Sequence, residues 1–255
     1  MSVEILVLIG CVSGAAAGFF GIGGGVIIVP CLLLLGMQME YAIGISIMQM
    51  VFSSTFGSLI NIFQKKLDIY HGIFVGFGGL IGASFSGIIV DTLSSQILLL
   101  LFLLLSCVSF YKYVFNVKTT ANPNPPITNP MKKKYFMIGA GFLTGIFAVS
   151  LGVGGGLILA PLLAYYLGFD SKKVVPISLF FIIFASVSGS VSLASHNLID
   201  FESGLIIGIS SMFGVACGIY LISKVTLSNH RYALISIYAF SIALTLWKAI
   251  QSFLD

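Results

Sequence analysis

The chain has 255 residues, of which 58% are hydrophobic and 8% charged, and its mean hydropathy of +1.11 excludes an ordinary soluble domain. The formal net charge of +4 does not indicate a nucleic-acid-binding surface, because the lysines lie between apolar segments and are densest at Lys132–Lys134. We therefore expect an all-α polytopic membrane protein that is surrounded by the lipid bilayer.

Apolar segments follow one another along the chain, and we predict that eight of them are membrane segments. Their ranges are 3–36, 41–63, 70–91, 95–115, 135–168, 174–196, 203–223 and 230–252. Residues 116–134, "NVKTTANPNPPITNPMKKK", contain four of the seven prolines and are predicted to form a polar loop. This linker separates a first half, 1–115, from a second half, 135–255, within one integrated membrane domain.

The two halves are copies of one four-segment unit. At an offset of 131, residues 10–30 match residues 141–161 at nine positions, and at an offset of 132 the match continues to the third segment of each half. The matched pairs include Gly21/Gly152, Gly23/Gly154, Gly24/Gly155, Gly25/Gly156, Pro30/Pro161, Ser46/Ser178 and Asp68/Asp200. Internal duplication with a segment interrupted by glycine and proline in each half is typical of secondary transporters.

The first segment of each half is 34 residues long, so a straight helix would reach roughly 51 Å and exceed the ~30 Å hydrocarbon core. Each is therefore either a broken, tilted spanning helix or a re-entrant hairpin. With hairpins, eleven of the twelve Lys and Arg residues fall on one side and only Lys248 on the other, as the positive-inside rule favours. We therefore predict inverted repeats, each of one hairpin and three spanning helices, with the linker cytoplasmic and both termini outside.

Glycine clusters interrupt both predicted hairpins, in "GFFGIGGGVIIVP" at 18–30 and "SLGVGGGLILAP" at 150–161. Irregular backbone at membrane depth is tolerated only where it is buried in protein or lines a cavity. Glycines let successive N–H groups converge into a nest for an anion, and the half-helix that follows directs its positive dipole end at the same place. Close helix packing through small residues is the alternative interpretation.

We predict that the two nests face each other around one anion near the membrane midplane. Hydroxyl and amide groups of the second segments would complete its shell, because no charged residue lies near the middle of any segment. The predicted helix-break residues are Pro30 and Pro161. The predicted substrate-binding residues are Gly21, Gly23, Gly24, Gly25, Ser46, Gln49, Gly152, Gly154, Gly155, Gly156 and Ser178.

Other polar positions receive structural interpretations. Asp68 and Asp200 precede the third segments and are expected to cap helices rather than to couple protons. The three histidines, His71, His196 and His230, lie near segment ends without paired metal spacing and are expected to be interfacial. No nucleophile–base motif or Walker loop is present, so we expect no catalytic residue, no metal, no cofactor and no enzyme activity. The sequence leaves the role of Cys31 open.

These motifs resemble the sulfite exporter family, also known as the 4-toluene sulfonate uptake permeases. The resemblance rests on the paired GxxGxGGGxxxxP segments, the serine-containing helix after each, and the junctions "KLDIYHG" and "LIDFESG", and it covers nearly the whole chain. One departure is that Val149 and Ser150 replace the Gly18 and Phe19 of the first half. The resemblance implies a multi-pass secondary transporter of the cytoplasmic membrane that moves sulfite, a sulfonate or a related organosulfur anion.

Two other interpretations stay open at the level of sequence. A transporter of another small anion, such as a carboxylate, would need the same glycine nests, whereas a non-transporting membrane scaffold would not need matched helix breaks. Since no nucleotide-binding motif is present, transport is expected to be driven by a coupling ion, either proton or sodium. The sequence does not distinguish import from export, and it does not fix the oligomeric state.

Overall fold

A computed structural model describes residues 1–115, 129–168 and 171–254. The helices of the first half are α1 (Val3–Phe20), α2 (Gly25–Leu34), α3 (Met39–Phe63), α4 (Ile69–Ala83), α5 (Ser86–Thr92) and α6 (Ser95–Phe115). Those of the second half are α7 (Pro130–Thr144), the π-helix η1 (Gly145–Val149), α8 (Gly156–Leu167), α9 (Ser171–Ser195), α10 (Phe201–Lys224) and α11 (Leu227–Leu254). The described residues contain helices and no strands, which confirms the all-α class.

Within the described ranges, seven helical stretches are long and apolar enough to cross a membrane. They are Val3–Phe20, Met39–Phe63, Ile69–Thr92, Ser95–Lys112, Val174–Ser195, Phe201–Lys224 and Ser228–Gln251. Large apolar side chains such as Phe77, Val191 and Phe213 are exposed on these helices. An apolar surface of this extent indicates lipid as the solvent, so the chain is a multi-pass membrane protein.

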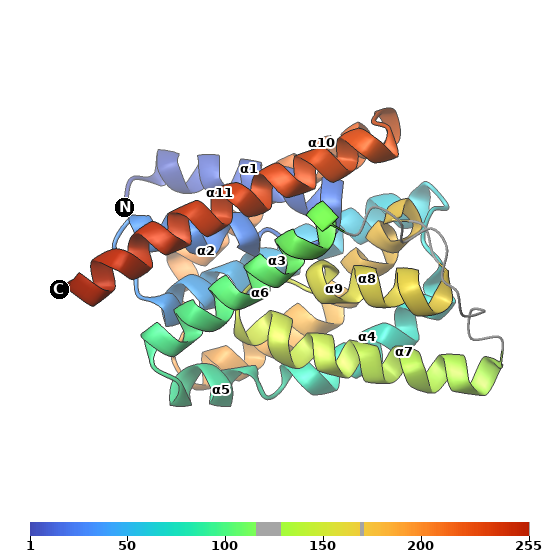
Figure 1. Cartoon of the computed structure of the whole chain (residues 1–255), viewed down its shortest axis with the longest axis horizontal. Coiled ribbons are helices and arrows are strands. Elements are labelled where there is room, and N and C mark those ends of the chain that lie inside the picture. The colour runs from blue at the N-terminus through green and yellow to red at the C-terminus, as the bar shows by residue number, and fades with distance from the viewer. Residues whose placement is uncertain (116–128, 169–170, 255) are drawn as a thin grey trace.

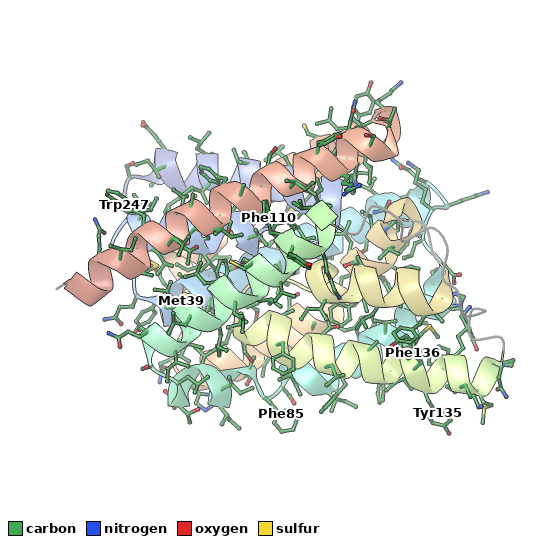
Figure 2. All side chains as sticks on the ribbon, viewed as in Figure 1. Met39, Phe85, Phe110, Tyr135, Phe136 and Trp247 are labelled. Carbon is green, nitrogen blue, oxygen red and sulfur yellow. The ribbon has the colours of Figure 1, made fainter. Side chains whose placement is uncertain are left out.

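Both ends of the chain lie at the same end of the molecule, and α7 begins at the opposite end (Figure 1). Exposed aromatic residues accompany both ends: Figure 2 shows Trp247 toward the end that carries the termini and Tyr135 toward the other. Aromatic residues of this kind are enriched at membrane–water interfaces. The long direction of the helices in Figure 1 is therefore the direction in which the protein crosses the bilayer.

The helices of the two halves interdigitate. Glycines of α1 pack on α10, and glycines of α4 pack on both α7 and α9. In α4, Gly76 packs on the ring of Phe184, and its repeat counterpart Gly208 packs on Phe52 in the same way. The glycines of the third segments thus serve close packing between helices.

The second helices of the two halves run antiparallel. Gly57 of α3 lies beside Leu179 of α9, whereas Gly189 of α9 lies beside Ile47 of α3. In Figure 1, α2 runs back beside α1 toward the end that carries the N-terminus. The packing of α3, α9 and the two broken segments brings residues from both halves together at the centre of the molecule.

The predicted linker is shorter at its C-terminal side than expected. Residues 130–134 are helical because α7 begins at Pro130, and the side chain of Asn129 accepts hydrogen bonds from the N–H groups of Met131 and Lys132 at 3.0 and 3.4 Å. Asparagine at the N-cap followed by proline is a favourable helix start. The rest of the predicted loop, 116–128, lies outside the described residues.

Candidate functional site

Both broken segments change direction at glycines with positive φ. Gly21 and Gly23 have φ of 67° and 74°, and their counterparts Gly152 and Gly154 have φ of 66° and 82°. A Cβ atom penalises this left-handed conformation, so glycine is the residue that fits here. At the first break, α1 ends at Phe20 and the N–H of Gly21 donates to the carbonyl of Ala17 at 2.8 Å. The chain then starts α2 four residues further on, at Gly25.

The two glycine turns touch each other. A Cβ atom on Gly154 would lie 3.0 Å from Cα of Gly23, and one on Gly25 would overlap the carbonyl oxygen of Gly152. In the same way, a Cβ on Gly156 would overlap the carbonyl of Gly21. The two backbones therefore cross in van der Waals contact. The expectation of one anion held between two facing nests is not met, because this arrangement leaves no room between the turns.

The place where the two glycine turns cross is called the crossing below. There, one serine from each half donates an equivalent hydrogen bond to the turn of the other half. The hydroxyl of Ser46 on α3 donates to the carbonyl of Gly152 at 2.7 Å, and that of Ser178 on α9 donates to the carbonyl of Gly21 at 2.6 Å. Both serines are buried. Since a serine hydroxyl has one proton to donate, neither serine has a proton left for an anion in this arrangement. Their geometry is that of positioning residues.

Gln49 is one of the predicted substrate-binding residues, and its side-chain amide lies at the crossing with its hydrogen-bonding groups unused. Its side chain is fully buried on α3, and within the described part of the chain neither Nε2 nor Oε1 has a hydrogen-bond partner. Its amide lies against Gly24, where a Cβ atom would be 2.7 Å from Oε1 and 2.9 Å from Nε2. A buried amide without a partner is costly, because its desolvation is not compensated.

The N-terminus of α2 adds further donors beside Gln49. Among the described residues, no acceptor is found for the backbone N–H groups of Gly23, Gly24 and Gly25. These groups belong to the first turn of a buried helix, where the orphan donors normally find a capping side chain, water or a ligand. The α2 N-terminus therefore offers several backbone donors and a positive dipole end, and the buried amide of Gln49 lies against its Gly24.

Phe181 occupies the corresponding place in the second half, and the sequence prediction missed it. Phe181 follows Gln49 by 132 residues, and its buried ring lies against Gly155, the counterpart of Gly24. The signal was available in the repeat itself, because a polar residue in one copy aligns with an aromatic residue in the other. The second half also differs before its break, where α7 passes into the π-helix η1.

The prediction that Pro30 and Pro161 break the helices is wrong. Both prolines lie inside continuous helices, Pro30 in α2 and Pro161 in α8. The breaks lie at the glycines that precede these helices. Each proline comes five residues after the first helical residue, and its missing N–H leaves only one carbonyl in the preceding turn unpaired, so the helix continues past it.

The aspartates are helix caps, as expected. Asp68 accepts from the N–H of His71 at 3.2 Å, and Asp200 accepts from the N–H of Ser203 at 3.3 Å. His230 is buried: the residue is 4% exposed, and its Nε2 lies 3.0 Å from the carbonyl oxygen of Phe19 near the end of α1.

Two of the cavities in the described structure are lined by residues other than the predicted binding residues. One of about 210 Å³ is lined by the end of α2, the start of α3 and Lys248 of α11, near the termini. The other, of about 360 Å³, lies between α6, η1 and α8 and is mostly apolar. Gln49 and Gly24 line neither of them. Both residues are buried in this arrangement.

Comparison with known proteins identifies the family. The model of the family described as "Sulfite exporter TauE/SafE" matches residues 6–245. The chain is 28% identical over 219 residues to the probable membrane transporter protein YunE of Bacillus subtilis, covering 75% of this chain and 78% of that one. It is 27% identical over 254 residues to a probable membrane transporter protein of Methanocaldococcus jannaschii, covering 91% of each. No solved structure matches. The glycine-broken helical repeat and the family match lead to one conclusion: the chain belongs to the sulfite exporter TauE/SafE family of membrane transporters.

Proposed function

We propose that this membrane transporter is a secondary transporter of a small sulfur-containing anion, such as sulfite or a sulfonate, and that the anion binds at the N-terminus of α2 beside Gln49. The observation that carries the proposal is the fully buried amide of Gln49 beside backbone donors of α2, none of which has a hydrogen-bond partner among the described residues. A bound oxyanion would satisfy these donors together. Neutral donors also suit a transporter, because an anion held without a fixed cation is released more readily than one in a buried ion pair.

Hydrogen bonds to the anion would supply most of the attraction at such a site. Each bond to a charged group contributes about 1.5–3 kcal/mol, so two or three of them supply roughly 3–9 kcal/mol toward offsetting the cost of association. The positive end of the α2 dipole adds to this attraction. The preference for sulfur oxyanions follows from the family; a carboxylate offers similar acceptors and is the competing substrate class that the experiment below includes.

Movement of the anion requires the crossing to open toward each side in turn. The hydrogen bonds from Ser46 to Gly152 and from Ser178 to Gly21 hold each glycine turn against a helix of the other half. Breaking one bond and keeping the other would free one broken segment at a time. We propose that this alternation, with the turns of Gly23 and Gly154 as hinges, gives access from the two sides of the membrane.

Flux of radiolabelled sulfite into proteoliposomes tests the proposed function, with benzenesulfonate and acetate as competitors. Gly24→Ala is the sharpest variant, because its backbone (φ −80°, ψ −12°) accepts alanine while the new methyl displaces the Gln49 amide. Gly139→Ala is the matched control, because a Cβ there meets nothing within 4 Å. We expect sulfite flux in the wild type and in Gly139→Ala and a loss of at least tenfold in Gly24→Ala. Flux competed by acetate and not by benzenesulfonate would establish the carboxylate alternative.

A further inference from the structure

The two halves place different side chains at equivalent positions of the crossing. Gln49 lies against Gly24 at the start of α2, and Phe181 lies against Gly155 at the start of α8. Both side chains are fully buried, and both glycines begin the turn before a half-helix. The repeat therefore builds the same backbone twice and lines it with an amide on one side and an aromatic ring on the other.

Helix α4 of the first half provides the space that the ring of Phe181 needs. The ring of Phe181 packs on Gly79 of α4 so closely that a Cβ atom there would overlap it. The repeat counterpart of Gly79 is Ser211 of α10, which is buried and has a Cβ atom. Position 181 carries a phenyl ring where its counterpart carries an amide, and position 79 is a glycine where its counterpart is a serine. Phe181 and the glycine that makes room for its ring therefore occur together in this chain.

The two helix starts consequently differ in what they can bind. At α2 an anion would meet the free N–H bonds of the Gln49 amide as well as the backbone donors. At α8 the ring adds no donor and covers Gly155. An anion at that place would meet backbone N–H groups of the start of α8 but no side-chain donor, and the apolar ring would desolvate it where the first half offers an amide.

We infer that Phe181 plugs the second of two repeat-related half-sites, so that each chain binds a single anion, at the Gln49 side of the crossing. The inference rests on the proposed function, since it takes the Gln49 side to be the anion site. It assigns to Phe181 the role of a residue that sets the number of anions bound per chain. A two-fold symmetric site, by contrast, would bind two anions or hold one between the halves.

Equilibrium dialysis of the purified full chain against saturating radiolabelled sulfite measures this number. We expect one sulfite per chain in the wild type and two in Phe181→Gln, which gives the second half the amide of the first. Phe181→Leu is the matched control, because it shortens the side chain and keeps it apolar, and it should stay at one. Size-exclusion chromatography and thermal unfolding check that each variant is folded.

Two sulfites per wild-type chain would overturn the inference and leave the proposed function standing. A folded Phe181→Gln that still binds one would overturn it as well. If Phe181→Gln does not fold, the wild type and Phe181→Leu decide: one sulfite in each supports the plug, and two in either contradicts it. A wild type that binds no sulfite would contradict the proposed function and this inference together.

Discussion

The hydroxyl of Ser46 donates a 2.7 Å hydrogen bond to the carbonyl oxygen of Gly152, a residue 106 positions away in the other half of the chain. Its repeat counterpart, from Ser178 to Gly21, has nearly the same length. Because each bond joins a second helix of one half to the broken segment of the other, the two halves hold each other closed. This reciprocal pair places the glycine turns where Gln49 can meet the start of α2.

Replacing either serine should destabilise the protein and leave its anion affinity nearly unchanged. Ser46→Ala leaves the buried carbonyl of Gly152 unpaired, which costs about 1–3 kcal/mol. Ser178→Ala should cost about the same, because its environment is equivalent. Thermal unfolding in detergent and sulfite binding measured on the same samples check this. A Ser46→Ala protein with wild-type unfolding and a tenfold loss of affinity would mean that the hydroxyl serves the anion instead.

Side chains at the contact between the two turns should prevent folding. A Cβ on Gly25 would overlap the carbonyl of Gly152, and one on Gly156 would overlap the carbonyl of Gly21, so Gly25→Ala and Gly156→Ala should not yield a folded, inserted protein.

Gly139→Ala is the control for these variants, and it should insert normally and gain up to about 1 kcal/mol from helix propensity. Gly76→Ala is a poorer control, since its Cβ would meet Phe184 at 2.5 Å. Insertion is measured by membrane fractionation and monodispersity after extraction. Monodisperse Gly25→Ala in the membrane fraction would refute the close crossing.

Asp200 should be replaceable by asparagine and not by alanine. The capping bond to the N–H of Ser203 needs a side-chain oxygen, which asparagine keeps. Asp200→Ala should lose about 0.5–2 kcal/mol of stability, while Asp200→Asn should keep both stability and transport. Unfolding temperature and sulfite flux at several pH values are the measurements. A stable Asp200→Asn protein whose flux no longer responds to a proton gradient would instead make the carboxylate a coupling group.

Both termini should face away from the cytoplasm, with Asn129 on the cytoplasmic side. The prediction rests on the eleven-to-one distribution of Lys and Arg, and it is compatible with the position of the termini opposite the start of α7 (Figure 1). A reporter that fluoresces only in the cytoplasm should be bright when inserted after Asn129 and dark at Asp255. Bright fluorescence at Asp255 would contradict the orientation.

Much of this architecture could be predicted from hydrophobicity and from the internal repeat. Segment positions follow from apolar length, and the pairing of Asp68 with Asp200 as caps follows from the match between the halves. The breaks at Gly21 to Gly24 could be predicted from the glycine clusters. The prolines gave a wrong prediction, because a proline about one turn into a helix removes a single hydrogen bond and does not end the helix.

The side-chain roles at the crossing could not be predicted, because they depend on three-dimensional contacts across the halves. Ser46 and Gly152 are distant in sequence, so nothing in a single segment indicates that the hydroxyl proton is already used. The burial of His230 against Phe19 likewise requires the packing of α11 on α1 and α2. Phe181 was detectable in principle, as the aromatic residue aligned with Gln49, but its meaning depends on the ring lying on Gly155.

The central claim is that the Gln49 amide and the start of α2 bind the anion, and equilibrium binding of radiolabelled sulfite to Gln49→Leu tests it most directly. Loss of one hydrogen bond to a charged group, about 1.5–3 kcal/mol, predicts an affinity roughly ten- to a hundredfold weaker than wild type. Gln64→Leu, at an exposed glutamine just after α3, is the matched control and should bind as the wild type does. A folded Gln49→Leu protein with wild-type sulfite affinity would contradict the account.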